Sequence, residues 1–310
     1  MLDSIVESAA GVNQDYGAAA NNLYGRIIKK QSFLQEHLVS GAAGVFVLAL
    51  VILPPVWFNS VMTAEHKNSL SEQFLRLEKT FNTFAELEPF FTVLTADKYL
   101  VKNMDDARIQ EFFQSGHSFV GQVLWPILAR YGCRFEGGRC LDFGCGLGRI
   151  TFALAPHFGR VVGGDISEEI LKWARDVLAQ LKLQNVSFVK TGEEIRKDVA
   201  GSFDFVHSVL VFQHMTPPLM QRSLGELLDI LAQDGVAALH VPVSIRGYAW
   251  DERKADWAVT YESIQMHCLP RKEVERIAGT CGCVVEDFAA TDLCGEGVEN
   301  GYFIIRKLRC

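Results

Sequence analysis

The stretch RCLDFGCGLGR, residues 139–149, decides the fold. A short apolar run (139–143) leads into a loop that holds Gly144, Gly146 and Gly148, and the helix-like run RITFALAPHF (149–158) follows. Glycines in such a turn let the backbone bend sharply and let a ligand approach without a Cβ in the way. The spacing is D-x-G-x-G-x-G, and Arg149 stands where a G-x-G-x-x-G dinucleotide loop has its last glycine.

Strand-like and helix-like segments alternate from this loop to the end of the chain. The expected strands are 139–143, 160–165, 186–190, 203–212, 236–243, 283–290 and 302–308, with helices over 167–183 and from Pro217 onward. This alternation predicts an α/β fold with a mostly parallel sheet and helices on both faces. Ligands of such sheets bind beyond the carboxyl ends of the strands.

Two acids specify the ligand further. Asp142 lies two residues before Gly144, where a carboxylate would repel a pyrophosphate but attract a cationic or amine-bearing ligand. Asp165 lies 21 residues after Gly144, at the end of the second strand, and is placed to accept hydrogen bonds from ribose hydroxyls. A nucleoside with a positively charged tail meets both requirements, and S-adenosylmethionine is such a molecule.

Residues 118–310 resemble a class I S-adenosylmethionine-dependent methyltransferase. The resemblance rests on LDFGCGLGR, VVGGDIS, FDFVHSVLVFQHM and LAQDGVAALHV. It implies a Rossmann-like seven-stranded sheet whose last strand, in the hairpin 283–308, is antiparallel. The cofactor-binding residues that follow from the loop and the resemblance are Asp142, Gly144, Cys145, Gly146, Gly148, Asp165, Ile166 and Glu193. Glu193 stands where the family often uses Asp for the adenine amine, although the family's Gly-Asp-Ala is Gly192-Glu193-Glu194 here.

The end of the fourth strand bears on the reaction. The family's enzymes for planar amino groups often carry Asn/Asp-Pro-Pro-aromatic there, whereas this chain has HSVL (207–210), which disfavours amino methylation of nucleic acid. His214 is the predicted catalytic residue, a neutral base that takes the proton of a hydroxyl acceptor. The alternative is a histidine that only packs over the cofactor. His207 and His240 are expected to be structural.

The connection 244–269 is long for a link between a strand and a helix, which indicates a functional insertion. It holds Arg246, Tyr248, Trp250, Trp257, Tyr261 and His267. We expect Arg246, Tyr248, Trp250 and Tyr261 to contact the methyl acceptor. A structural cap on the edge of the sheet would use the same residues.

Residues 1–117 form an extension that we expect to be mainly helical, because Leu75, Leu77, Phe81 and Phe84 recur at helix-like steps. Within it, residues 38–58 (LVSGAAGVFVLALVILPPVWF) contain no charged side chain. In a helix these 21 residues would span about 30 Å, the thickness of a bilayer's hydrocarbon core. The segment predicts membrane contact by spanning or re-entry; the alternative is buried soluble core.

The membrane prediction raises a question of orientation. Arg26, Lys29 and Lys30 before the segment favour a cytoplasmic N-terminus, which would place the rest of a spanning chain outside. The cofactor is cytosolic, so we expect a membrane-associated protein with its catalytic domain on the cytoplasmic side. A soluble cytoplasmic protein is the alternative.

Composition excludes several classes of protein. With 49% hydrophobic and 22% charged residues the chain can build a large core, which excludes a disordered or fibrous protein. A net charge of −7 makes nucleic acid a poor partner. The eight cysteines include no C-x-x-C pair, so neither a disulfide framework nor a zinc site is indicated, and no other metal cluster is visible.

The function expected is methyl transfer from S-adenosylmethionine to oxygen or carbon of a small-molecule or lipid acceptor, by direct displacement. Two alternatives stay open: a protein methyltransferase, and a module that binds the cofactor without catalysis. A nicotinamide-dependent oxidoreductase is disfavoured by the glycine spacing. The sequence identifies neither the acceptor nor the oligomeric state.

Overall fold

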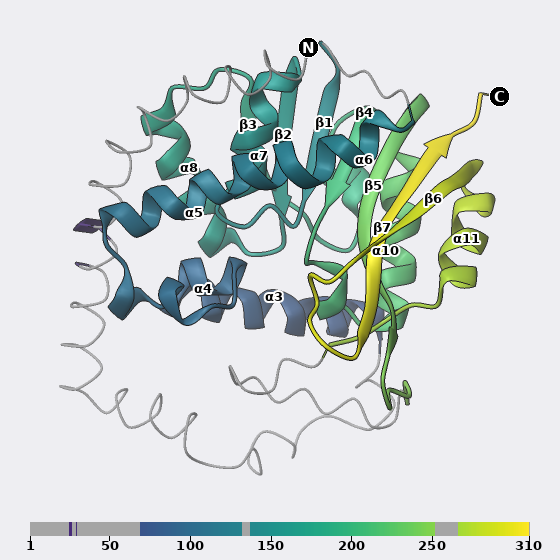
Figure 1. Cartoon of the computed structure of the whole chain (residues 1–310), viewed down its shortest axis with the longest axis horizontal. Helices are drawn as coiled ribbons and strands as arrows, with labels where there is room; N and C mark the ends of the chain where they lie inside the picture. The colour runs from purple at the N-terminus through teal and green to yellow at the C-terminus, as the bar shows by residue number, and fades with distance from the viewer. Residues whose placement is uncertain (1–24, 27–28, 30–68, 132–136, 252–265, 310) are drawn as a thin grey trace.

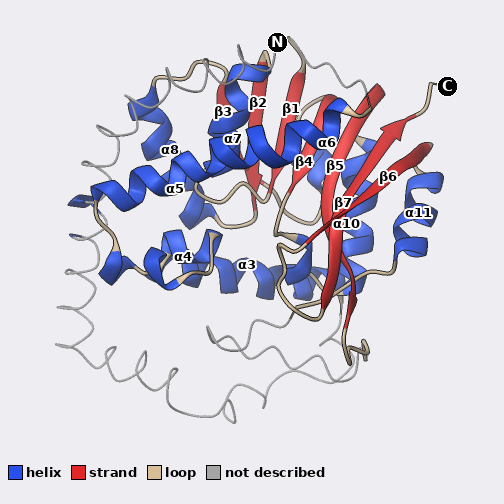
Figure 2. Ribbon diagram, viewed as in Figure 1, coloured by secondary structure: helices blue, strands red, loops and turns tan. Residues whose placement is uncertain are grey.

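The computed structural model describes residues 25–26, 29, 69–131, 137–251 and 266–309. Within these residues, seven strands form one sheet in the order β3-β2-β1-β4-β5-β7-β6. The strands are β1 (Arg139–Phe143), β2 (Arg160–Asp165), β3 (Val186–Lys190), β4 (Phe203–Ser208), β5 (Leu231–Ile245), β6 (Cys283–Thr291) and β7 (Val298–Lys307). The first five run parallel, and β7 is antiparallel to both β5 and β6. The expected sheet, with its final antiparallel hairpin, is confirmed (Figure 2).

Helices lie on both faces of the sheet and at one end of it (Figure 1). They are α3 (Leu70–Leu87), α4 (Pro89–Val93), α5 (Asp106–Phe119), α6 (Trp125–Ala129), α7 (Arg149–Leu154), α8 (Glu168–Leu181), α9 (Ile195–Asp198), α10 (Pro217–Asp229) and α11 (Arg271–Thr280). Buried side chains of α5 to α8 form one hydrophobic core with the sheet, and those of α9 to α11 form the other. The helices α3 and α4 lie across the carboxyl ends of the parallel strands.

The strands read as continuous apolar runs because both faces of the sheet are covered. Side chains alternate between the two cores along β1: Cys140 packs in the core that includes α5 to α8, and Leu141 packs in the core that includes α10. Tyr302 and Phe303 on β7 divide in the same way. This alternation leaves Asp142 on the α5 side, a polar group in an apolar layer.

The N-terminal helical extension is confirmed over its described part. Ser69 caps α3 by accepting a hydrogen bond from the amide of Glu72 at 3.3 Å. Leu77 and Phe84 are buried, as their spacing predicts. Leu75 was placed wrongly in that apolar face, since it is 64% exposed and lies one position off the stripe that contains Phe74 and Leu77.

Several predicted elements have different bounds in the structure; for example, β5 begins at Leu231 and not at 236, and β7 begins at Val298 and not at 302. The strand expected over 203–212 ends at Ser208, because Leu210 adopts a left-handed backbone (φ +58°) that breaks the extended chain. The helical region that follows α4 is not one continuous α-helix, because it divides into α5, a π turn (Val120–Leu124) and α6. Pro126 lies in the first turn of α6, and its missing amide and its ring disrupt the regular helix upstream.

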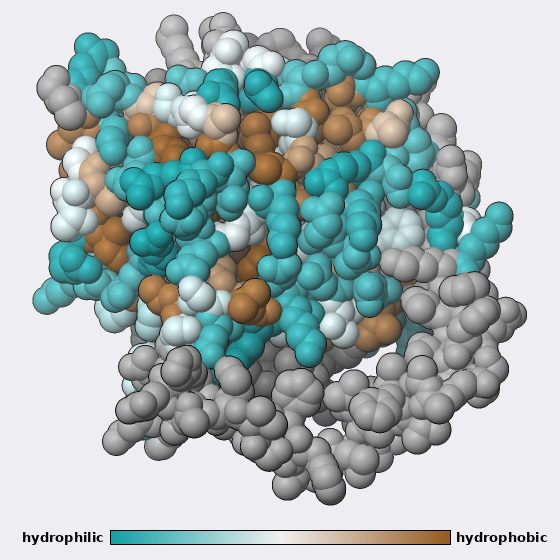
Figure 3. Space-filling view, turned by 180° about the vertical axis from the view of Figure 1, so that it is seen from behind, coloured by the Kyte–Doolittle hydropathy of each residue, from teal (hydrophilic) through white to brown (hydrophobic). Residues whose placement is uncertain are grey.

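No helix within the described ranges is long and apolar enough to cross a membrane. The segment 38–58 lies outside those ranges, so its membrane contact stays a prediction. Seen from behind, the described surface shows hydrophobic side chains interleaved with hydrophilic ones (Figure 3), which is ordinary for a folded domain.

Four buried histidines predict acid sensitivity of the fold. Burial lowers the pKa of His117, His214, His240 and His267 from 6.5 to about 4 in each case. Between these pH values the unfolded chain binds more protons than the native one, so stability falls as the pH falls through this window. The pKa of Asp165, raised from 3.8 to about 6, acts in the opposite direction. The free energy of unfolding should therefore drop by up to about 4 kcal/mol per pH unit between about pH 6 and 4.5.

Denaturant unfolding at a series of pH values measures this slope. The variant His240→Gln removes one titrating group, so the slope of the unfolding free energy with pH should decrease by up to the contribution of one bound proton. An unfolding free energy that stays constant from pH 7 to 5 would contradict the assignment of neutral buried histidines.

Candidate functional site

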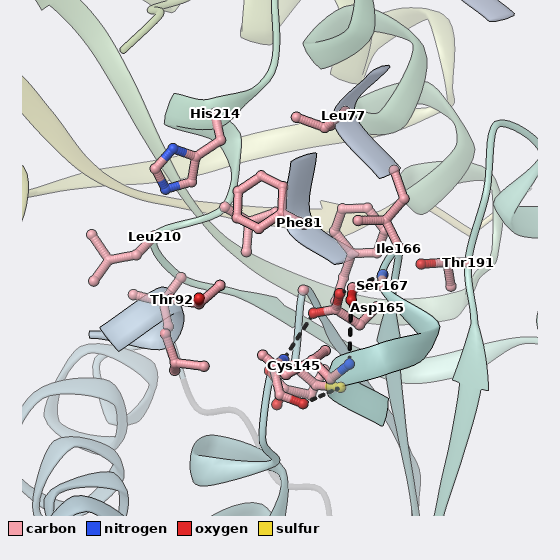
Figure 4. A pocket seen from close by; sticks show the side chains of 18 of the residues that line it. Leu77, Phe81, Thr92, Cys145, Asp165, Ile166, Ser167, Thr191, Leu210 and His214 are labelled. Carbon is pink, nitrogen blue, oxygen red and sulfur yellow. Dashed lines mark hydrogen bonds between the residues drawn. The ribbon is translucent and has the colours of Figure 1, made fainter. Parts of the chain in front are cut away.

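A cavity opens at the carboxyl ends of β1, β2 and β4, beneath α3 and α4 (Figure 4). The ends of these strands, the loops after them and after β3, and the first turns of α7 and α8 contribute Asp142, Phe143, Gly144, Cys145, Gly146, Arg149, Ile150, Asp165, Ile166, Ser167, Ile170, Thr191, Gly192, Val209, Leu210, Val211, His214 and Met215. The helices α3 and α4 contribute Phe74, Leu77, Phe81, Thr92 and Val93. The predicted cofactor residues, apart from Gly148 and Glu193, are thus brought together with His214 around one cavity.

The glycine loop is held in a backbone conformation that other residues rarely adopt. Gly144, Gly146 and Gly148 have φ values of +73°, +52° and +85°. A Cβ on Gly144 would lie 2.1 Å from Cγ2 of Val211, and one on Gly146 would lie 2.6 Å from Cγ2 of Val93. Both conformation and space therefore require glycine here.

Asp165 connects this loop to β2. Its Oδ2 accepts a hydrogen bond from the amide of Gly146 and its Oδ1 from the amide of Ser167, both at 2.9 Å. Burial nevertheless raises the pKa of Asp165 to about 6, since two amide bonds offset only part of the lost hydration. In Figure 4 the carboxylate lies beside the cavity with both bonds drawn. Each oxygen keeps a lone pair that a ligand's hydroxyl can use.

Asp142 is held by protein groups. It is 2% exposed, its Oδ2 accepts from Oγ1 of Thr151 at 2.6 Å, and its Oδ1 lies 2.9 Å from Nδ1 of His207. The other nitrogen of His207 lies 3.2 Å from the hydroxyl of Tyr302. Asp142 therefore acts on the cavity mainly through its charge, and the structural role expected of His207 is confirmed.

Cys145 and Ile166 both line the cavity, as expected of loop residues. Burial, together with the charges of Asp165 and Asp142, raises the pKa of the Cys145 thiol well above its usual value. The thiol is thus neutral and poorly nucleophilic. Among the described residues, no cluster of histidine, cysteine and acidic side chains is arranged to hold a metal ion.

Glu193 lies apart from the cavity, whose lining ends at its neighbours Thr191 and Gly192. Its Oε2 accepts a hydrogen bond from the hydroxyl of Ser71 on α3 at 2.7 Å. The carboxylate predicted to contact adenine therefore holds the covering helix in this structure.

His214 lies at the other side of the cavity from Asp165, next to Phe81 and Leu210 (Figure 4). The ring of Phe81 meets its imidazole edge-on, with centroids 5.4 Å apart. Nδ1 of His214 is buried and has no hydrogen-bond partner among the described residues. Burial, with the neighbouring His267, lowers the pKa of His214 to about 4, so the ring is neutral at pH 7.

Of the predicted acceptor-binding residues, Arg246, Tyr248 and Trp250 do not line the cavity. Arg246 is exposed. The hydroxyl of Tyr248 bonds Nδ1 of His267 at 2.8 Å, and Trp250 packs edge-on against the same ring at 5.3 Å. The amide of His267 donates to the carbonyl of Gln213, which connects this group to the turn (Phe212–His214) that carries His214. Tyr261 lies outside the described residues.

Sequence reasoning missed the apolar cover of the cavity. Phe74, Leu77 and Phe81 project from α3, and Thr92 and Val93 from α4. These helices lie in the extension that shows no family resemblance, so the sequence offered only the helical spacing of Leu77 and Phe81.

Polar contacts fasten α3 to the sheet domain. Oδ1 of Asn82 accepts from Oγ of Ser167 at 2.8 Å, and Oγ1 of Thr216 donates to Oε1 of Gln73 at 2.5 Å. Lys190 donates to Glu78 at 2.5 Å. Together with the bond between Ser71 and Glu193, these contacts place α3 over the ends of the strands.

Comparison with known proteins identifies the domain. The profile of a family described as "Methyltransferase domain" matches residues 140–235. The ubiquinone biosynthesis O-methyltransferase of Xanthomonas campestris pv. campestris is 32% identical over 93 residues, which are 30% of this chain and 39% of that protein. The protein of the same name from Coxiella burnetii is 32% identical over 100 residues, 32% of this chain and 42% of that protein. The chain thus matches well under half the length of these relatives.

The fold is shared with solved methyltransferase structures. That of magnesium protoporphyrin IX methyltransferase from Synechocystis, with SAH (S-adenosylhomocysteine) bound, has a TM-score of 0.52 at 16% identity, covering 74% of this chain and 98% of that one. At this identity the likeness shows the fold alone. With the family match and the glycine loop, it confirms the resemblance read from the sequence: the chain contains a class I methyltransferase domain, of the family whose cofactor is S-adenosylmethionine.

Proposed function

We propose that this protein transfers a methyl group from S-adenosylmethionine to oxygen or carbon of a small, largely apolar acceptor. One observation carries the proposal: a single cavity joins the glycine loop and Asp165 at one side to the apolar walls around His214 at the other. The two relatives named as ubiquinone biosynthesis O-methyltransferases support a small-molecule acceptor and transfer to oxygen.

The residues of the cavity fit the cofactor. Gly144 and Gly146 both line the cavity, and only glycine fits at these positions, because a Cβ there would collide with Val211 or Val93. The ionisable lining at pH 7 comprises Asp142, Asp165 and Arg149, with His214 neutral, so its net charge is negative. That sign complements a sulfonium ligand. Asp165 would hold the ribose hydroxyls, and the bound cofactor would supply an electrophilic methyl group.

The apolar side of the cavity would receive the acceptor. Phe74, Leu77 and Phe81 from α3 face Leu210 and Val211 from the loop after β4. Such walls exclude water and restrict the acceptor to a few orientations, which is the main help a displacement reaction needs.

His214 would orient the nucleophile. A neutral imidazole keeps one unprotonated ring nitrogen, which would accept a hydrogen bond from an acceptor hydroxyl. Because burial lowers the pKa of His214 to about 4, the ring is a weaker base than an ordinary histidine. We therefore assign His214 chiefly to holding the acceptor hydroxyl in line with the methyl group. The ring would take the hydroxyl proton only as positive charge develops on the hydroxyl oxygen during the transfer.

Methyl transfer is tested with full-length protein, methyl-labelled S-adenosylmethionine, and separate lipid, small-molecule and protein fractions as acceptors. We expect label in a small or lipid product that extracts into organic solvent. Label in protein alone would contradict the proposed acceptor class. A protein that binds the cofactor but labels none of the fractions would contradict the enzymatic function.

Asp165 should control cofactor affinity. Asp165→Asn should weaken binding of S-adenosylhomocysteine by about 10- to 100-fold in calorimetry, as expected for a hydrogen bond to a charged group. Because the pKa of Asp165 is about 6, wild-type affinity should rise from pH 5 to 7 and then level off, and the variant should lose this dependence. Asp106→Asn, an exposed site on α5, is the matched control. Equal affinity of wild type and Asp165→Asn at pH 7 would refute the ribose assignment.

His214 should control turnover and not cofactor binding. His214→Ala should lower the rate by roughly 10²-fold, the effect of a misoriented nucleophile, while the affinity for S-adenosylhomocysteine stays within a few-fold. His214→Asn, which keeps a polar group near the same place, should recover part of the rate. Normal turnover in His214→Ala would reduce the residue to packing against Phe81.

A further inference from the structure

Arg149 is a buried cation beside the proposed cofactor site. It is the first residue of α7, directly after the glycine loop, and it lines the cavity. Only 6% of its surface is exposed. Long charged side chains are rarely buried to this extent without an ionic partner.

The protein supplies little to neutralise this charge. Among the described residues, Arg149 makes no salt bridge, and its Nε has no hydrogen-bond partner. Its Nη1 reaches only Oγ of Ser115, at a long 3.4 Å, and the guanidinium lies 5.8 Å from the ring centre of Phe119. Burial accordingly lowers the pKa of Arg149, although an arginine keeps its proton at any physiological pH.

The nearest acid cannot serve as a direct partner. The charge of Asp142 acts on Arg149, but the two oxygens of Asp142 already bond Thr151 and His207. The neighbouring hydroxyl of Tyr302 is a neutral group whose pKa burial raises further. A buried guanidinium with an unused N–H is costly, so the arrangement is complete only when an anionic ligand group enters the cavity.

The two charges next to each other match an amino-acid zwitterion. Asp142 and Arg149 carry opposite charges, and both line the cavity that holds Asp165 at the end of β2. A ligand whose ribose lies at Asp165 and whose tail carries an ammonium and a carboxylate would have a matching group for each of the three side chains. Guanidinium groups bind carboxylates through two parallel hydrogen bonds, which also fixes direction.

We propose that Arg149 binds the carboxylate of the cofactor's amino-acid tail and so determines how the cofactor lies in the cavity. The inference rests on the proposed function, because it takes S-adenosylmethionine as the ligand. Arg149 is then a positioning residue: it holds the end of the cofactor away from the reacting methyl group and aims that group at the side of His214.

Calorimetry with two ligands tests this assignment directly. S-adenosylhomocysteine carries the carboxylate, and its decarboxylated counterpart keeps the ammonium but lacks the carboxylate. Arg149→Met should weaken S-adenosylhomocysteine by about 10- to 100-fold and change the affinity for the decarboxylated ligand by less than about threefold. Arg149→Lys keeps the positive charge but loses the two parallel N–H groups of the guanidinium. Its affinity for S-adenosylhomocysteine should lie between those of wild type and Arg149→Met. Arg271→Gln, on the exposed side chain that pairs with Glu299, is the control.

The outcomes separate the possible errors. Equal weakening of both ligands in Arg149→Met would mean that Arg149 only supports the fold, and unchanged binding of both would mean that it does not touch the ligand; either result overturns the inference. An unchanged affinity for S-adenosylhomocysteine with weaker binding of a carboxylate-bearing acceptor would assign the arginine to the acceptor and also overturn it. If wild-type protein binds neither ligand, the proposed function itself fails.

Discussion

The site depends on the two hydrogen bonds that the carboxylate of Asp165 accepts from backbone amides. Through the amides of Gly146 and Ser167 it connects the loop after β1 to the end of β2 and the start of α8. The carbonyl of Gly164 on β2 also holds the loop, because it accepts hydrogen bonds from the amides of Gly144 and Cys145. The same carboxylate that is needed for a ligand thus shapes the loop that receives the ligand. Burial raises the pKa of Asp165 to about 6, although its hydrogen bonds to the loop amides act in the opposite direction.

The other half of the cavity comes from outside the recognisable domain. Phe74, Leu77 and Phe81 of α3 cover the ends of the strands, and side-chain bonds such as that of Asn82 with Ser167 keep the helix there. In the proposed function, cofactor recognition lies in the sheet domain, whereas the walls of the acceptor side lie largely in the extension. This division explains how one fold serves different acceptors through its additions.

The accuracy of the sequence predictions follows the range of the interactions involved. The bounds of β1, β2 and β3 were predicted correctly, because buried parallel strands are apolar runs that end at glycine or at a polar residue. The glycine loop and Asp165 were found because their chemistry depends on short spacing. The end of β4 was missed, since nothing local signals that Leu210 takes a left-handed backbone.

Long-range partners could not be predicted in the same way. The carboxylate of Glu193 bonds Ser71, which is 122 residues away in the chain, and no local pattern shows that bond. The aromatic residues Tyr248 and Trp250 read as an acceptor site, but they surround His267, while a helix from the other end of the chain supplies the cavity's rings. In the sequence, Arg149 drew attention only because it stands where a dinucleotide-binding loop has its last glycine. Its burial depends on tertiary packing, which no local pattern shows.

A crystal structure of the full chain with S-adenosylhomocysteine is the measurement that tests the central claim most directly. The account predicts that the ribose hydroxyls lie within hydrogen-bond distance of Asp165 and that the sulfur faces the side of the cavity formed by Leu210 and His214. A ligand bound outside this cavity, or one whose ribose lies at His214 instead, would contradict it.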